Sequence, residues 1–277
     1  MMKSNNPFKK LRPLVLSAVA ATSLLSIGCA SVGGGTTQVV APVTTTPTAA
    51  KFQVYDNMFY SGKPNTGPFG LIPSNIAYEA DIWPNGATAS SETVLPSRSS
   101  FDALMATKAK AGPLVLDVEL LGLNSAQNEQ VLATLADWVH QDWPGKVVGY
   151  YGTNTLTGVS PQNLVYAQEL ATHVDVMFPP MYTFNTDESA WATLAATEAA
   201  EARSIAPGKP VYFYIWPQYH QGTPMADQYL TPAYWTFELQ TSQGIADGVV
   251  LWSSSSEAWN DSDGWWEATQ AFMATLQ

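Results

Sequence analysis

Cysteine, histidine and basic residues are scarce in this 277-residue chain. The single cysteine, Cys29, makes a disulfide within the chain impossible. His140, His173 and His220 lie far apart without the spacing of metal ligands, so each is expected at the surface or a rim. No Gly-x-Ser-x-Gly motif is present, and no glycine-rich phosphate loop follows the first expected strand. These absences argue against serine hydrolases, metal sites and dinucleotide-binding folds, and no cofactor is expected.

Basic residues are also concentrated at the start of the chain. The sequence has 12 Lys and Arg against 23 Asp and Glu. All four charged residues of the first 50 are basic, so 8 of the 12 remain beyond them and the rest carries a net charge near −15. A surface this acidic repels nucleic acids and anionic lipids, so neither is expected as a partner.

Residues 1–28 have the pattern of an export signal peptide. Lys9, Lys10 and Arg12 precede an apolar run from Leu14 to Ile27 that ends among small residues. The run is too short to span a membrane comfortably. This pattern predicts a protein that is exported to the cell envelope.

Cys29 directly follows this signal and resembles the lipidated cysteine of bacterial lipoproteins. Such signals usually carry Leu three residues before the cysteine, where this chain has Ser26. Lipidation would anchor the protein at the outer membrane or cell surface, whereas ordinary cleavage nearby would leave it periplasmic or secreted. Residues 29–50, rich in Gly, Thr and Pro, are expected to form a flexible tether, so any membrane contact would be through the lipid alone.

From residue 51 to 277, short strand-like runs alternate with longer helical stretches. Strands are expected at 51–62, 74–86, 113–123, 146–152, 175–184, 209–219 and 247–256. Helices are expected at 99–112, 125–145, 160–174, 187–208, 231–245 and 264–277. This alternation predicts one α/β catalytic domain with a parallel sheet, a small TIM-like (β/α) barrel of seven to eight strands.

Barrels of this kind carry their chemistry at the C-terminal ends of the strands, and that rule separates the acidic residues. Asp175 and Asp247 precede their strands and belong to the opposite, stabilising rim. Asp117 and Glu119 lie late in the third expected strand, within an otherwise apolar run. The rule therefore places this pair at the mouth of the barrel.

Asp117 and Glu119 are two residues apart, so they share one face of their strand. Two carboxylates this close repel each other, which raises the pKa of one of them. A carboxylic acid that is still protonated near neutral pH can protonate the departing oxygen of a glycosidic bond. Because the two acids approach a sugar from the same side, they suit a substrate-assisted mechanism better than an acid and a nucleophile on opposite sides.

Two other interpretations of the acids remain open. Asp117 and Glu119 could satisfy a lysine or backbone groups inside the barrel. Glu79 and Asp81 have the same spacing, late in the second expected strand, and could line the same mouth or pair with basic residues.

Aromatic residues gather at the same expected rim. Sugars bind by ring stacking combined with hydrogen bonds, so aromatic rings at strand ends indicate a carbohydrate site. Those at or near the ends are Tyr150, Tyr151, Tyr182, Tyr214, Trp216, Tyr219 and Trp252. Some can be core packing, but most, together with Asp81, are expected to line the substrate groove.

Five segments occur in the order found in the hyaluronidases of animals and venoms, and this region resembles that glycoside hydrolase family. LVLDVE (114–119) is similar to the family's strand that ends in its Asp-x-Glu catalytic pair. The other segments are VVGYYG (147–152), VMFPPMYTF (176–184), KPVYFYIWPQY (209–219) and GIADGVVLWSSSSE (244–257). The resemblance implies an irregular seven-stranded barrel and covers about residues 110–256.

The resemblance also implies roles for four residues. Glu119 would be the general acid and base, and Asp117 would position the acetamido group of the sugar. Tyr214 would contact the acetamido group or the transition state, and Trp252 would form the wall against which the N-acetyl group packs.

The chain departs from this family in three respects. YYGTNTLTGVS (150–160) lacks the family's active-site tyrosine at this point, for which Tyr151 or Tyr182 could substitute. The family's disulfides are absent. The family binds polyanions in a basic groove, whereas here only Lys63, Arg98 and Lys146 are near expected loops.

The sequence thus predicts an exported glycoside hydrolase that cleaves an N-acetylhexosamine polysaccharide by a retaining, substrate-assisted route. One alternative is a lysozyme-like muramidase acting on peptidoglycan. Another is a catalytically silent carbohydrate-binding barrel, favoured by the missing tyrosine and opposed by the presence of Asp117 and Glu119.

Overall fold

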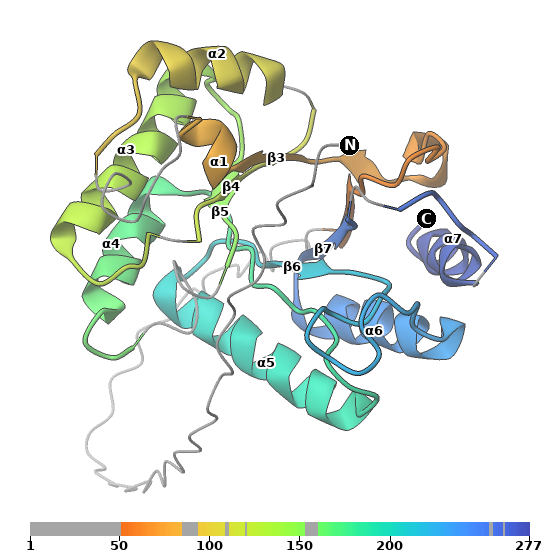
Figure 1. Cartoon of the computed structure of the whole chain (residues 1–277). Helices are drawn as coiled ribbons and strands as arrows, with labels where there is room; N and C mark the ends of the chain where they lie inside the picture. Colours follow the sequence, from red (N-terminus) through yellow and green to blue (C-terminus); the bar gives the residue numbers. More distant parts are fainter. Residues whose placement is uncertain are drawn as a thin grey trace, which may run out of the picture. The chain divides into compact units, whose positions relative to one another are not determined.

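The structure is a computed structural model that describes residues 51–84, 94–108, 111–119, 121–152, 160–254, 257–262 and 264–277. The expected signal and tether, residues 1–50, lie outside these ranges. Helices surround a set of strands that lie near the middle of the fold (Figure 1). Within the described ranges, no helix combines the length and apolar character needed to cross a membrane.

All strand pairs of the two sheets are parallel, as predicted. The first sheet has the order β2-β1-β7-β6 and the second β3-β4-β5. The strands are β1 (Gln53–Asn57), β2 (Ile72–Pro73), β3 (Asn75–Tyr78), β4 (Leu114–Asp117), β5 (Val148–Tyr150), β6 (Tyr212–Ile215) and β7 (Gly248–Trp252).

Two further connections join the sheets. Phe178 bridges Tyr151 at the end of β5, and Pro180 bridges Tyr214 in β6. Only Ser74 separates β2 from β3, so residues 72–78 form one nearly continuous strand. Its first part, β2, pairs with β1, and its second part, β3, pairs with β4. The pairings therefore pass from strand to strand around the domain, as expected for a β/α barrel.

Six long helices lie where the sequence predicts them: α2 (Arg98–Lys108), α3 (Ala126–Asp142), α4 (Leu164–His173), α5 (Glu188–Ile205), α6 (Pro232–Ile245) and α7 (Trp265–Thr275). Side chains of Ser125, Asp187 and Thr231 accept backbone N–H hydrogen bonds at the starts of α3, α5 and α6. These caps satisfy donors that have no partner within the helix, which fixes where each helix begins.

Every expected strand is shorter in the structure: β4, expected to reach residue 123, ends at Asp117, and two other runs change more. The run 74–86 leaves the sheet after Tyr78 and turns into α1 (Glu79–Ile82), so Glu79 and Asp81 lie in a helix and their placement on a strand is wrong. The pairing of β3 with β4 ends at Tyr78, and Glu79 and Asp81 are then favourable in the first turn of α1. The run 175–184 forms only isolated bridges, because Pro179 and Pro180 have no N–H to donate to a ladder.

Side-chain alternation along the strands divides the interior into two clusters. Val115, Tyr55, Tyr214 and Val250 point into the barrel, where they share one cluster with Phe178. Their strand neighbours, such as Leu114, Leu116, Phe213 and Leu251, join a second cluster with residues of the helices. The barrel interior is therefore rich in aromatic rings, and the layer between strands and helices is largely aliphatic.

The N-terminal rim has the stabilising role that the sequence predicts for its acids. Asp175 accepts a hydrogen bond from the backbone N–H of Val148 at 2.9 Å and pairs with His140 at 2.8 Å. Asp247 accepts one from the backbone N–H of Val211 at 2.9 Å. Both carboxylates thus satisfy backbone donors where neighbouring strands start.

Candidate active site

Asp117 and Glu119 share the inward face of the segment that includes β4. Val115 points into the barrel, and Leu114, Leu116 and Val118 pack towards the helices. Alternation places Asp117, the last residue of β4, on the side of Val115. Glu119 lies two residues beyond the end of the strand, and Val118 between them packs towards the helices, so Glu119 follows Asp117 on the inward side. Glu119 is exposed to solvent, whereas Asp117 is largely covered.

Asp117 carries a buried oxygen to which no described residue donates a hydrogen bond. Its Oδ1 atom is buried and has no hydrogen-bond partner among the described residues. Burial raises the pKa of Asp117 well above its ordinary value, and repulsion from Glu119 and Glu79 raises it further. An unsatisfied buried acceptor is unfavourable in the free protein, and a donor on a bound ligand could satisfy it.

Partial desolvation also raises the pKa of Glu119, although its side chain is exposed, and repulsion from Glu79 contributes. Glu79, the first residue of α1, therefore acts electrostatically on both acids. The two raised pKa values mean that this group of carboxyls holds a proton at higher pH than isolated carboxyls do.

Aromatic side chains surround this acidic group in what we call the mouth cluster, which comprises Tyr78, Tyr151, Tyr182, Tyr214, Trp216 and Trp252. The ring of Tyr151 lies 5.1 Å from that of Tyr214 and 6.3 Å from that of Tyr182. The ring of Trp252 lies 5.8 Å from Tyr182 and 5.1 Å from Trp216. These residues lie in β3, β6 and β7, directly after β5 and β6, and in residues 175–184, so the fold brings together the strand ends that the sequence predicts.

The tyrosine hydroxyls of the mouth cluster lie close to the acids. Desolvation raises the pKa of Tyr151, Tyr182 and Tyr214 well above the ordinary value, and the charge of Asp117 raises each further. All three therefore stay protonated at neutral pH, as hydrogen-bond donors. The hydroxyl of Tyr214 donates to Oδ1 of Asn57 at 3.4 Å.

Sequence reasoning missed three residues of this site. Tyr78 ends β3, and its hydroxyl accepts a hydrogen bond from Trp252 Nε1 at 3.3 Å. Asn57 ends β1 on the inward side and contacts Tyr214. His220, expected at a rim, stacks on Tyr182 with ring centres 5.2 Å apart. The strand-end rule applied to β1 and β3 would have found Asn57 and Tyr78.

Other predicted site residues lie apart from this group. Tyr219 belongs to the second cluster, where its ring contacts Tyr234. Tyr150 points to the helices, and its hydroxyl donates a hydrogen bond to the Leu132 carbonyl at 2.7 Å. Tyr150 is therefore a core residue, although it lies near the end of its strand. Asp81 pairs with Lys108 at 3.6 Å. Contact of Tyr219 or Asp81 with a substrate stays a prediction.

Trp216 is buried behind the other rings of the mouth cluster, with 1% of its surface exposed. It supports Trp252 and Tyr182 from within, and direct contact between Trp216 and a substrate also stays a prediction.

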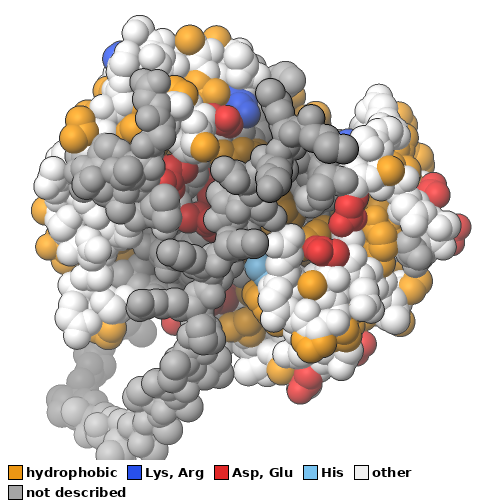
Figure 2. Space-filling view, in the orientation of Figure 1, with side chains coloured by type: hydrophobic (Ala, Val, Ile, Leu, Met, Phe, Trp, Pro, Cys, Tyr) orange, Lys and Arg blue, Asp and Glu red, His pale blue; other side chains and the backbone are white. Residues whose placement is uncertain are grey.

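The basic residues singled out from the sequence have partners within the protein. Lys63 pairs with Asp56 at 2.5 Å, Arg98 pairs with Asp142 at 2.5 Å, and Lys146 donates to a backbone carbonyl. Acidic side chains are visible in the middle of the viewed face and along its right and lower edges, and few basic ones are visible (Figure 2). This charge distribution differs from a groove built for polyanions.

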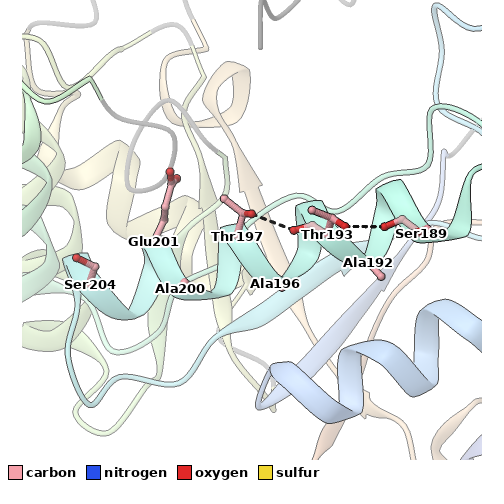
Figure 3. A pocket seen from close by; sticks show the side chains of 8 residues that line it. All are labelled: Ser189, Ala192, Thr193, Ala196, Thr197, Ala200, Glu201 and Ser204. Atoms are coloured by element: carbon pink, nitrogen blue, oxygen red, sulfur yellow. Dashed lines mark hydrogen bonds between the residues drawn. The ribbon is translucent and has the colours of Figure 1, made fainter. Parts of the chain in front are cut away.

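A hollow of about 860 Å³ lies along the outer face of α5 and is open to solvent (Figure 3). It is lined by Ala, Ser and Thr side chains and by one acid, Glu201. The hydroxyls of Thr193 and Thr197 bond to carbonyls of their own helix. With one titratable group and no aromatic ring, this hollow offers fewer side chains for catalysis or sugar binding than the barrel mouth. Nowhere in the described ranges do three or more metal-ligand side chains gather.

No protein-family model and no curated protein sequence matches this chain. Among solved structures, the chain is similar to bee venom hyaluronidase, with a TM-score of 0.60, 15% identity, and coverage of 81% of this chain and 97% of that one. A second structure of that enzyme, in complex with a hyaluronic acid tetramer, gives a TM-score of 0.60 at 15% identity, covering 80% and 96%. A GH18 chitinase from Pseudoalteromonas aurantia aligns at a TM-score of 0.48 and 14% identity, covering 79% and 99%. The similarity to bee venom hyaluronidase shows that the two proteins share a fold.

Proposed function

We propose that this protein is a glycoside hydrolase that cleaves an N-acetylhexosamine-containing polysaccharide by a retaining, substrate-assisted mechanism. The observation that carries the proposal is the buried, unsatisfied Oδ1 of Asp117 beside Glu119, at the aromatic mouth of the barrel. The N–H of a 2-acetamido group is a donor of the kind that Asp117 lacks. The shared fold with bee venom hyaluronidase supports this assignment.

In the proposed reaction, Asp117 accepts a hydrogen bond from the acetamido N–H and turns the acetamido oxygen towards the anomeric carbon. That oxygen attacks, the glycosidic C–O bond breaks, and Glu119 gives its proton to the leaving oxygen. Water then attacks the anomeric carbon, returns a proton to Glu119 and restores the acetamido group. Glu119 is the more exposed of the two acids, so it is the one that can reach a leaving group.

The mouth cluster would hold the sugar during these steps. Trp252 is partly exposed and offers a ring for the N-acetyl group to pack against. Tyr151 and Tyr182 are protonated donors close to Asp117, where they can stabilise charge on the acetamido group. Tyr214 has none of its surface exposed and its hydroxyl donates to Asn57, so its direct contact with the sugar stays a prediction. Tyr151 and Tyr182 are therefore the candidates to replace the tyrosine that the hyaluronidase pattern has and this chain lacks.

Release of reducing sugar tests the proposal. The full-length protein is incubated separately with hyaluronan, with N-acetylglucosamine oligomers and with purified peptidoglycan. Glu119→Gln should abolish cleavage while glycan binding persists, and the matched control Glu201→Gln, on the outer face of α5, should retain full activity. Glycan binding without cleavage by the unmutated protein would leave a carbohydrate-binding barrel, and cleavage of peptidoglycan alone would favour the muramidase.

For the N-terminal region, we propose export and lipid anchoring at Cys29, with residues 51–277 as the catalytic domain. The support is the sequence alone: a basic start, an apolar run and a small-residue exit before the cysteine. Cys29→Ala should move the protein from the membrane fraction to the soluble fraction of expressing bacteria. Unchanged fractionation would contradict the anchor and leave the proposed catalysis untouched.

A further inference from the structure

Two aromatic side chains are exposed among the described residues, Phe59 with 40% and Phe184 with 52% of its surface accessible. The other exposed large hydrophobic residues are aliphatic: Val94, Leu95, Val147, Val165 and Leu194. Single exposed hydrophobic residues are common on proteins and need no explanation. These two rings differ because both connect to the candidate active site.

Phe59 contacts Tyr78, a residue of the mouth cluster. The two rings lie 6.5 Å apart, and the hydroxyl of Tyr78 accepts the hydrogen bond of Trp252 Nε1. One exposed ring thus borders the mouth cluster on the side of β1 and β3.

Phe184 contacts His220, which in turn contacts Tyr182 of the mouth cluster. Its ring lies 4.8 Å from His220, which stacks on Tyr182 at an angle of 18° between the rings. Tyr182 in turn contacts Trp252 at 5.8 Å. A continuous path of aromatic contacts therefore runs from Phe59 through Trp252 and Tyr182 to Phe184, with an exposed ring at each end.

The backbone around Phe59 is held firmly. Its N–H donates to the hydroxyl of Ser253 at 2.7 Å. The residues on both sides, Met58 and Tyr60, are buried, and the hydroxyl of Tyr60 donates to Gln218 at 3.1 Å. The ring of Phe59 is exposed although its neighbours in the chain are anchored in the core.

Phe184 lies in a similar setting. Thr183 is buried and donates its hydroxyl to Glu238, and its carbonyl accepts from the backbone N–H of His220 at 2.8 Å. On the other side, the carbonyl of Asn185 accepts from the hydroxyl of Tyr234 at 3.3 Å. A backbone that is held in place before binding lowers the entropic cost of stacking a ligand on the ring it carries.

We propose that Phe59 and Phe184 are outer sugar-binding platforms on opposite sides of the acid pair, each stacking on the apolar face of an uncharged pyranose unit. This inference rests on the proposed function and extends its binding groove in both directions. Phenyl rings offer apolar area and no charge, so they suit neutral N-acetylhexosamine units. Acids lie close to the Phe184 platform, since Asp187 and Glu188 follow it in the chain and the charge of Asp227 acts on His220. Carboxylated sugars would be repelled there.

Binding to oligomers of different length tests the platforms. Titration calorimetry on the full-length Glu119→Gln protein measures affinity for the N-acetylglucosamine hexamer and dimer. Phe59→Ala and Phe184→Ala should each weaken hexamer binding about tenfold, through loss of buried apolar area, and leave dimer binding within about twofold. Phe184→Tyr should retain hexamer affinity. Leu194→Ala, a comparably exposed apolar residue outside the aromatic path, should change neither affinity.

Three results would contradict the role of the platforms. In the first, both alanine variants bind the hexamer as tightly as the Glu119→Gln parent. In the second, the variants lose as much affinity for the dimer as for the hexamer, and in the third, the parent itself binds hexamer and dimer with equal affinity. An unchanged melting temperature shows that a variant is folded. If the unmutated protein cleaves no polymer, the proposed catalysis fails, but length-dependent losses would still support the platforms. If it cleaves polymers and neither alanine variant affects hexamer binding, the platforms alone are rejected.

Discussion

Trp252 Nε1 donates a hydrogen bond to the hydroxyl of Tyr78 at 3.3 Å, between residues 174 positions apart in the chain. Tyr78 ends β3 and Trp252 ends β7, so the bond joins two strand ends at the mouth of the barrel. Burial raises the pKa of Tyr78 to about 12, so its hydroxyl is neutral at any physiological pH. The bond fixes the indole of Trp252, the ring against which the proposed substrate packs.

Tyr78→Phe tests whether this bond orients Trp252. The variant keeps the ring that contacts Phe59 and removes only the acceptor of the indole N–H. We expect KM to rise several-fold with a smaller change in kcat, and the free energy of unfolding to fall by about 1 kcal/mol. Steady-state kinetics and urea denaturation measure both quantities. Tyr166→Phe, a partly buried hydroxyl on α4, is the matched control, and equal kinetics in both variants would contradict the role of Tyr78.

Asp117→Asn should separate stability from activity. The pKa of Asp117 is raised in the folded state, so its ionisation costs stability as pH rises above the ordinary carboxyl value of about 4. At pH 7 the variant should be more stable than the parent by about 1–3 kcal/mol, and at pH 4, where the parent carboxyl is already protonated, this difference should shrink. Cleavage should fall by about 10²-fold or more, because a neutral amide stabilises developing positive charge poorly.

Denaturant unfolding at both pH values, combined with reducing-sugar assays, checks this prediction. The opposite result would be a variant that loses stability relative to the parent when the pH rises from 4 to 7. It would show that a partner in the folded protein stabilises the ionised carboxylate of Asp117. That outcome would remove the observation on which the proposed function rests.

The sequence predicts much of this fold because its helices and strands follow simple local rules. The pattern of apolar residues locates α3, α5 and α6, and in the structure Ser125, Asp187 and Thr231 cap their starts. Strand periodicity puts Asp117 on the side of Val115, which faces the barrel interior, although β4 ends at Asp117 and Glu119 lies just beyond it. These features depend on residues close together in the chain.

Features that depend on distant residues could not be predicted in this way. No local pattern shows that the strand at 74–86 ends at Tyr78, because the turn into α1 depends on where β3 leaves β4. Similarly, Tyr150 and Tyr151 are adjacent and identical in the sequence. Only the register of β5 decides that Tyr151 points into the barrel and Tyr150 packs against α3.

Glu238 on α6 should act as a neutral acid that holds the segment carrying Tyr182. It is fully buried, accepts the hydroxyl of Thr183, and has a pKa raised well above the ordinary value by burial. A raised carboxyl pKa favours the folded state at low pH, and this advantage is lost as pH rises above the ordinary value. Glu238→Gln keeps an acceptor for Thr183 without the charge, so the variant should fold and lose less stability than the parent between about pH 5 and pH 9.

Thermal melting across that range measures the effect. Glu238→Ala is the contrasting variant, because it leaves the buried Thr183 hydroxyl without a partner and should be less stable than the parent at every pH. If Glu238→Gln is as destabilised as Glu238→Ala, the carboxyl is ionised in the folded protein and this account of Glu238 is wrong.

Gly149 in β5 should be intolerant of any side chain, although its backbone is that of an ordinary strand. A Cβ atom at this position would lie 2.3 Å from the carbonyl oxygen of Val176 and 3.0 Å from the ring of Phe178. The space that Gly149 leaves lets Phe178 fill the barrel interior beneath Tyr214, since these two rings lie 5.9 Å apart. Gly149→Ala must therefore move backbone or displace Phe178, and we expect it to destabilise the fold by about 1–3 kcal/mol.

Gly244→Ala is the matched control for this change. Gly244 lies in α6, where an added Cβ meets nothing within 4 Å, so alanine should leave stability unchanged or raise it by up to about 1 kcal/mol. Chemical denaturation of both variants gives the comparison, and opposite signs are expected. Because Phe178 supports Tyr214, which contacts Tyr151, Gly149→Ala should also lower cleavage in the fraction that remains folded. Equal stability of the two variants would mean that β5 and residues 175–184 are not packed as closely as the structure shows.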